Sequence, residues 1–308
     1  MKKIRPVTNV AASIRDRLLN LHRSSGTEYQ RLMNQYALER LLYRLSVSEH
    51  RDGFLLKGAM LFTVWEGAPH RMTKDLDLLG FGDPGVAGIT EKFRDLSVLA
   101  VADDGLSFDA GSVQGGEIRE GASYPGVRIT MKAMMGAARI NLQIDIGFGD
   151  SCRDPEEVVV PSLLGMPAPQ LRAYRRETVV AEKLEAINLL GLQNTRLKDY
   201  FDLWFLGSRF DFDGKVLAAA IAATFARRGS KFPDGKPRGL SEEFWTDVRQ
   251  ITAWKGFWNK SNVDGPMPSL EEVTRFIAEF VGQPLREAAV PKGWAGKWTT
   301  GGPWSACS

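Results

Sequence analysis

Three aspartates of the chain have the spacing expected of metal-binding carboxylates. Asp75 and Asp77 stand two positions apart in a short apolar segment, so both side chains would point to one face of a strand. Like charges held this close repel unless a cation or a proton lies between them, and a hard divalent ion with oxygen ligands is the usual solution. The alternative is that the pair only ends a surface strand, because short acidic motifs also arise by chance.

Asp145 is the third carboxylate. In the segment 138–148 apolar and polar residues alternate, which predicts a strand that carries Asp145 on its polar face. An aspartate on the wet face of an antiparallel sheet would give the same pattern. Together with Asp75 and Asp77 it would form the three-carboxylate cradle that a two-metal phosphoryl-transfer site requires.

Lys183 lies at the edge of the apolar stripe of a helix predicted over 178–191. A lysine in this position can hold a triphosphate as a point charge. It can equally extend its stem along the core and leave its amine in water. Periodicity does not separate these two interpretations.

Asp199 lies on a helix over 196–210 that is apolar on two sides and is therefore expected to be buried. A buried carboxylate needs a partner, and Arg196, Lys198 and Asp202 all stand within one turn of it. These four residues could form a structural ion-pair network without any catalysis. They could also belong to a functional site, because both situations look alike in a sequence.

The elements that must position these residues begin with a strand over 54–56, a turn at Lys57-Gly58-Ala59, a helix over 60–66 and a strand with Asp75. Two helices precede them, and the second is expected to start with a capping box of Thr27 and Gln30. Further strands are predicted over 106–115, 126–135 and 138–148, and further helices over 90–101, 215–227, 242–258 and 270–281. A proline-rich linker over 152–173 separates an α+β domain, residues 1–165, from a mostly helical domain, residues 166–308.

Composition excludes several classes of protein. The 308 residues are 44% hydrophobic and 25% charged, with a net charge of +3, which are globular values and only mildly basic. Two cysteines far apart and three scattered histidines do not fit a disulfide framework or a zinc site. No segment has the length and apolar character of a membrane span, so we expect a soluble, cytoplasmic protein without a membrane partner.

A basic loop over 227–238 is a candidate nucleic-acid contact. Five cations surround Phe232, so the loop could follow a phosphodiester backbone and offer a ring for stacking. A solvated mobile loop has the same composition. The tail from Pro291 contains three tryptophans and no periodicity, and it predicts no element.

Five motifs in order resemble the AbiEii/AbiGii toxin family of nucleotidyltransferases, which includes the MenT toxins. The likeness covers most of the chain, and five weak motifs in order are more specific than any one of them. The motifs are Lys57-Gly58-Ala59, the run Arg71-x-Thr73-x-Asp75-Leu76-Asp77, the pair Gln143-x-Asp145, the helix Glu182-Lys183-Leu184-x-Ala186 and the helix Arg196-x-Lys198-Asp199-x-x-Asp202.

The resemblance implies a polymerase-beta-like nucleotidyltransferase domain, a mixed sheet with flanking helices, followed by a helical C-terminal domain that completes the active site. By position, Asp75 and Asp77 match the metal-binding pair, Lys183 the lysine that holds the NTP phosphates and Asp199 an acid needed for activity. Asp145 resembles the third strand carboxylate. Characterised relatives transfer nucleotides from an NTP to the 3′ end of tRNA and act with an antitoxin, in growth arrest or phage defence.

The first turn departs from the wider superfamily, which has Gly-Ser or Gly-Gly where this chain has Gly58, Ala59 and Met60. Backbone N–H groups of the turn can still bind phosphate, and Lys57, Arg71, Thr73 and Arg196 are further candidates for that contact.

The expected function is therefore an Mg²⁺-dependent toxin that transfers a nucleotide to RNA by a two-metal mechanism. Two alternatives stay open. One is a small-molecule nucleotidyltransferase of the aminoglycoside-modifying kind, and the other is a non-catalytic module that binds nucleotide or RNA.

Overall fold

The computed structural model describes residues 9–67, 75–118, 126–152, 154–261, 263 and 265–306. Arg71 and Thr73 lie outside these residues. The chain forms two compact units, one of residues 1–149 and 155–173, the other of residues 150–154 and 174–308. Residues 166–173, which the sequence assigned to the helical domain, thus belong to the first unit.

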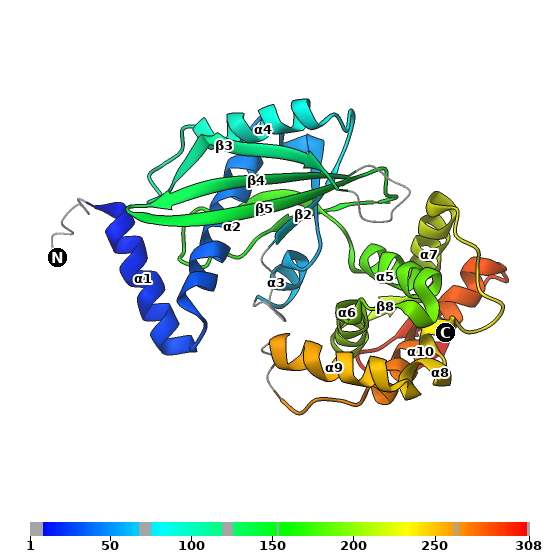
Figure 1. Ribbon diagram of the computed structural model, residues 1–308. Helices are drawn as coiled ribbons and strands as arrows, with labels where there is room; N and C mark the ends of the chain where they lie inside the picture. Colours follow the sequence, from blue (N-terminus) through cyan, green and yellow to red (C-terminus); the bar gives the residue numbers. More distant parts are fainter. Residues whose placement is uncertain are drawn as a thin grey trace. The chain divides into compact units, whose positions relative to one another are not determined.

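A seven-stranded mixed sheet forms the centre of the first unit, with the strand order β3-β4-β5-β2-β1-β7-β6. Figure 1 shows β3, β4, β5 and β2 side by side. Parallel pairs occur at β5–β2 and β1–β7, and the other neighbours are antiparallel. The mixed sheet with flanking helices confirms the predicted fold class. The strands are β1 (Phe54–Lys57), β2 (Asp75–Gly80), β3 (Ser107–Glu117), β4 (Gly126–Met135), β5 (Ala138–Phe148), β6 (Glu156–Val159) and β7 (Gln170–Ala173).

The alternation of apolar and polar residues that the sequence predicted shows which face of the sheet forms the core. On β5 the residues Ile140, Leu142, Ile144 and Ile146 are almost completely buried, while the residues between them face the other side. On the apolar side, helix α4 (Val86–Val98) packs against β3 (Figure 1). The polar side is therefore left for charged and amide side chains, among them Asp145.

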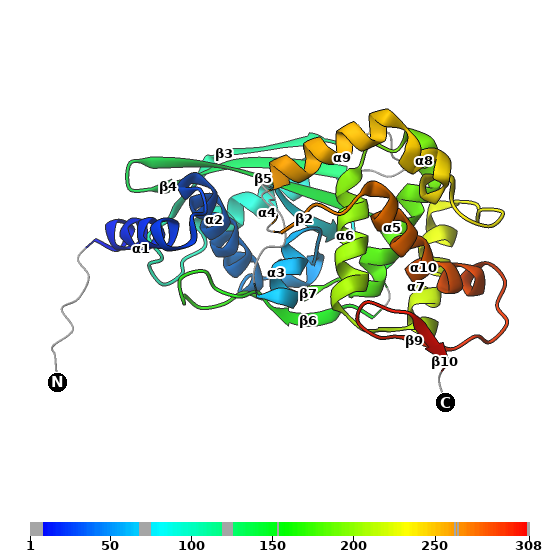
Figure 2. The ribbon, with the colours of Figure 1, turned by 90° about the horizontal axis from the view of Figure 1, so that it is seen from below.

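Helices α1 (Val10–Ser25) and α2 (Tyr29–Ser46) form a hairpin in the first unit, and α3 (Met60–Glu66) follows β1 (Figure 2). Glycine at position 26 ends α1 in the left-handed region, as is common for helix C-termini. The predicted capping box of Thr27 and Gln30 is wrong. Helix α2 begins at Tyr29, so Glu28 is the N-cap residue and no side chain caps the helix. Thr27 therefore precedes the cap, and Gln30 is the second helical residue rather than the third, which the capping box requires.

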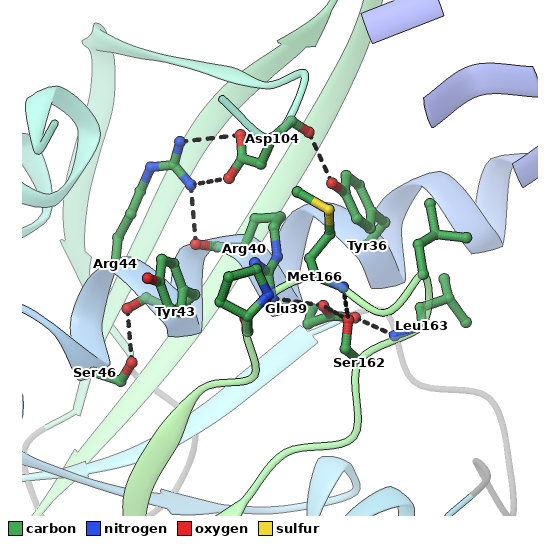
Figure 3. A network of polar contacts seen from close by, with 12 residues as sticks. Tyr36, Glu39, Arg40, Tyr43, Arg44, Ser46, Asp104, Ser162, Leu163 and Met166 are labelled. Atoms are coloured by element: carbon green, nitrogen blue, oxygen red, sulfur yellow. Dashed lines mark hydrogen bonds and ion pairs between the residues drawn. The ribbon is translucent and has the colours of Figure 1, made fainter. Parts of the chain in front are cut away.

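Polar side chains of α2 hold two distant segments (Figure 3). Arg44 forms an ion pair of 2.6 Å with Asp104, and both side chains are almost fully buried. Glu39 accepts hydrogen bonds from the Ser162 hydroxyl at 2.9 Å and the Leu163 N–H at 2.7 Å. These contacts tie the segment between β6 and β7 to α2 by hydrogen bonds to a buried charge, which are among the stronger kind.

The second unit is mostly helical, as predicted. Its helices are α5 (Arg176–Leu190), α6 (Leu197–Arg209), α7 (Gly214–Arg228), α8 (Glu242–Thr246), α9 (Val248–Ser261) and α10 (Leu270–Ala289). The single helix predicted over 242–258 is two helices, because the Asp247 side chain accepts the N–H of Arg249 and starts a new helix there.

The tryptophan-containing tail forms strands. β9 (Gly296–Trp298) pairs with β8 (Phe212–Asp213) and with β10 (Trp304–Ala306) in a three-stranded sheet. Trp298 is completely buried and donates its indole N–H to the carbonyl of Gly207. In the described part of the chain no helix combines the length and the apolar character needed to cross a membrane.

Candidate functional site

The carboxylate pair of the first unit lies on β2. Asp75 and Asp77 are half-buried, whereas Leu76 and Leu78 between and after them are buried on the opposite face. The parallel register sets Asp77 directly beside Asp145, and Asp75 beside Gln143. Residues directly opposite in a ladder share a face, so the three aspartates predicted from the sequence lie on one face of two adjacent strands.

Gly58 lies against this pair. It adopts φ +74°, where an L side chain is strained, and a Cβ built on it would lie 2.0 Å from Oδ2 of Asp77. Only glycine leaves room for the carboxylate beside the turn between β1 and α3. The turn predicted to bind phosphate is thus packed against the carboxylate predicted to bind metal.

A cross-strand row of charges includes Asp77. The register places Lys57 of β1 opposite Asp77, and Arg128 of β4 opposite Asp145. Two carboxylates therefore stand between two cations on one face of the sheet. Such alternation offsets the repulsion between the carboxylates.

Arg128 binds Asp145 through two parallel hydrogen bonds of 2.8 Å, from Nε and from the terminal nitrogen. Gln143 adds longer contacts of 3.3 and 3.4 Å to the same carboxylate. Both oxygens of Asp145 thus already have a partner, a bidentate geometry typical of arginine. Among the described residues no three carboxylate, histidine or cysteine side chains are grouped as a metal site would need.

Arg128 is a residue that the sequence interpretation missed, although a signal existed. Met135 pairs with Ala138 across a two-residue turn that contains Gly136. Counting outwards from this turn by equal steps on both strands pairs Arg128 with Asp145. A tight turn between two alternating segments fixes the register in this way.

The candidate residues of the second unit form a buried ion-pair network between α5 and α6. Nζ of Lys183 lies 2.8 Å from Oδ1 of Asp199 and 2.7 Å from Oδ2 of Asp202. Nε of Arg196 lies 2.7 Å from Oδ2 of Asp199. Both carboxylates are completely buried, while the Lys183 side chain is 14% and the Arg196 side chain 52% exposed.

The network has the charge balance that burial demands, two cations for two anions. The residues of this network differ from those that helical spacing predicted. Lys183 of α5 forms the ion pair that was expected of Lys198, and Lys198 is exposed. Helical spacing identifies partners within one helix only, so a lysine from another helix could not be found in this way.

Two residues of the segment 227–238, predicted as a basic loop, are engaged within the second unit. Arg228 is bound to Asp150, Glu182 and Glu185 at distances of 3.1, 3.6 and 2.8 Å. Phe232 stacks on the ring of Phe225 with 4.6 Å between the centroids. The Arg228 guanidinium is therefore held by carboxylates, and one face of the Phe232 ring is covered by Phe225.

One protein-family model matches most of the chain, and two solved structures resemble it distantly. A family model described as the nucleotidyl transferase AbiEii toxin of a type IV toxin–antitoxin system matches residues 40–299. The chain resembles the crystal structure of JHP933 from Helicobacter pylori, at TM-score 0.48 and 14% identity over 85% of this chain and 93% of that one. A second H. pylori structure, provisionally named a nucleotidyltransferase, gives TM-score 0.44 and 14% identity over 85% and 96%. No curated protein sequence matches significantly.

Proposed function

Since the chain belongs to the AbiEii nucleotidyl transferase toxin family of type IV toxin–antitoxin systems, we propose that it transfers a nucleotide from an NTP to the 3′ hydroxyl of an RNA, with tRNA as acceptor. The family supports a nucleotidyltransferase with an NTP as substrate and a cognate antitoxin as partner. The observation that carries the proposal is the carboxylate pair on β2, packed against the backbone of the Gly58 turn.

In this proposal Asp75 and Asp77 hold Mg²⁺. Half-buried carboxylate oxygens on one strand face are the ligands that a hard divalent cation prefers. Bound Mg²⁺ would lower the pKa of the acceptor hydroxyl and offset charge on the α-phosphate. Both carboxylate oxygens of Asp145 accept hydrogen bonds from Arg128. Asp145 would therefore become a metal ligand only if the Arg128 guanidinium moved away and the cation took its place.

The reaction forms a bond from the acceptor oxygen to the α-phosphorus and breaks the bond from that phosphorus to the bridging oxygen of pyrophosphate, while the hydroxyl proton passes to water. The chain contributes position and charge rather than a covalent intermediate. Backbone N–H groups of the Gly58-Ala59 turn are proposed to bind phosphate oxygens, with Lys57 as a nearby cation.

Lys183 is proposed as the cation that contacts the NTP phosphates. Its ammonium is shared by Asp199 and Asp202, which fix its position. We propose that Asp199 acts through Lys183 and Arg196 as a positioning residue, because both of its oxygens are bound to these cations.

The test is transfer of label from each α-³²P-NTP to total tRNA with Mg²⁺, read on a denaturing gel. We expect label on RNA with the wild-type protein and with the control Asp16→Ala, an exposed aspartate of α1. Asp75→Ala and Asp77→Ala should fold normally by circular dichroism and transfer nothing.

Retained transfer by both variants would refute the metal assignment. Transfer to an aminoglycoside but not to RNA would support the small-molecule alternative. Binding of NTP with no transfer to any acceptor would support the non-catalytic alternative.

A further inference from the structure

A groove lies along the polar face of the sheet in the first unit. It has a volume of about 760 Å³ and is lined by β2, β3, β4, β5 and the start of α2. This volume is within the range of known ligand sites. Asp75 lines it together with Gln143, so the groove reaches the first carboxylate of the pair.

A row of side chains leads from Asp75 along the groove. The register pairs Asp75 with Gln143, Gln143 with Thr130, and Thr130 with Gln114. Three steps between strands span roughly 14 Å. Amide and hydroxyl groups therefore continue outwards from the carboxylate over more than the width of one nucleotide.

Three cations line the same groove: Arg31 of α2, Lys132 of β4 and Arg139 of β5. Within the described residues, no hydrogen bond or ion pair occupies the side chains of Lys132 and Arg139, and both residues are exposed. Burial lowers the pKa of Arg31, and the attraction of Glu28 opposes this shift. Because these cations stand on three different elements, they can contact the separated phosphates of a polynucleotide better than the adjacent phosphates of one triphosphate.

The remaining lining favours bases that are read by hydrogen bonds. The side-chain amides of Asn141 and Gln114 can both donate hydrogen bonds to base edges and accept them. The carboxylates of Asp109 and Glu28 can accept hydrogen bonds from the amino groups of bases. Of the described residues that line the groove none is aromatic, so stacking platforms of the usual single-strand kind are not part of it.

We propose that this groove binds the last nucleotides of a single-stranded RNA 3′ end and delivers the terminal hydroxyl to Asp75. The inference rests on the proposed function and adds the surface that selects the acceptor. Phosphates bind Arg31, Lys132 and Arg139, and the amides contact bases.

The first test measures binding of a 5′-fluorescein single-stranded RNA that ends in CCA, by anisotropy, over a range of KCl concentrations and without NTP. The variant is Lys132→Ala/Arg139→Ala. Its matched control is Arg15→Ala/Arg23→Ala, which removes two exposed arginines of α1 outside the groove. Circular dichroism and thermal unfolding check the fold of both.

We expect the groove variant to bind about 20-fold more weakly near 0.1 M salt. The slope of log affinity against log salt should fall by about 1.4, which is two lost phosphate contacts on a single strand. The control should keep the wild-type slope. Gln114→Ala/Asn141→Ala should weaken binding without changing the slope, because base contacts release no counterions.

Wild-type affinity and slope in Lys132→Ala/Arg139→Ala, with transfer to RNA intact, would overturn the groove assignment and leave the proposed function standing. Absence of any transfer to RNA by the wild-type protein would overturn the proposed function itself. A rise in KM for RNA with unchanged KM for NTP in the groove variant would support both.

Discussion

Lys183→Met should destabilise the second unit strongly. The substitution keeps the volume of the side chain but removes an ammonium that lies 2.8 and 2.7 Å from two completely buried carboxylates. Breaking a buried pair from one side typically costs about 3–5 kcal/mol, and little of this is screened because the Lys183 side chain is only 14% exposed. Arg196 still pairs with Asp199 after the substitution, whereas Asp202 loses the ammonium that lies 2.7 Å from its Oδ2.

A double variant tests this reasoning. Lys183→Met/Asp202→Asn removes one charge of each sign and leaves the ion pair of Arg196 with Asp199. We expect it to recover about 2–3 kcal/mol of the loss, the upper range for residues in direct contact. Lys198→Met is the control, since that lysine is exposed on α6, the helix that carries Asp199 and Asp202, and it should change stability by less than about 0.5 kcal/mol.

The assay is urea unfolding followed by tryptophan fluorescence. Seven of the eight tryptophans, all except Trp65, lie in residues 174–308, so the signal reports the second unit. The m-value should stay unchanged if only stability changes. A loss below about 1 kcal/mol in Lys183→Met, or no recovery in the double variant, would refute the view that the network holds α5 to α6.

Three further perturbations test other parts of the chain. Gly58→Ala should cost about 1–2 kcal/mol from its left-handed backbone alone, and its Cβ should displace the Asp77 carboxylate; full transfer activity would contradict this. Trp298→Ala should cost about 3–5 kcal/mol in urea unfolding, because the ring is completely buried; a loss below about 1 kcal/mol would show that the tail is dispensable. Hydrogen bonds from the Ser269 backbone N–H and hydroxyl lower the pKa of Glu272, so its contribution to stability is present above the unfolded pKa and disappears as pH falls through the folded pKa. Ser269→Ala removes the hydroxyl and keeps the backbone N–H, so the pKa of Glu272 should rise part of the way to its unfolded value in an NMR titration; an unchanged pKa would contradict the role of the hydroxyl.

Local patterns predicted the parts of the fold that depend on neighbouring residues. The alternation on β5 and the helical periodicity of α1 and α6 each follow from a pattern that one segment contains. The split between α8 and α9 was also readable, because Asp247 is a strong N-cap residue at the break. The tail was not, since its three-residue strands are too short to show a period.

The sequence nominated candidate site residues, and their assignment stays a prediction, but it did not identify the partners that the structure places beside them. The spacing of Asp75 and Asp77 identifies them as candidates in the sequence. The ion pair of Lys183 with Asp202 joins two helices, so no pattern within one segment of the sequence indicates it. Arg228 illustrates the same limit, because its acidic partners lie 43 to 78 residues away in sequence. Charge composition alone made that arginine resemble an RNA contact.

The hydrogen bonds from α2 to residues 162–167 also bear on the order of folding. They join residues 123 to 127 positions apart, so forming them requires the closure of a long loop, which is slower than forming local contacts. Until then β1 lacks its partner β7, which it meets at Leu56 and Ala173, and the nascent sheet carries an open edge that could pair with other chains. Pulsed hydrogen exchange during refolding should show the amides of β7 protected after those of β2, and simultaneous protection would exclude this order.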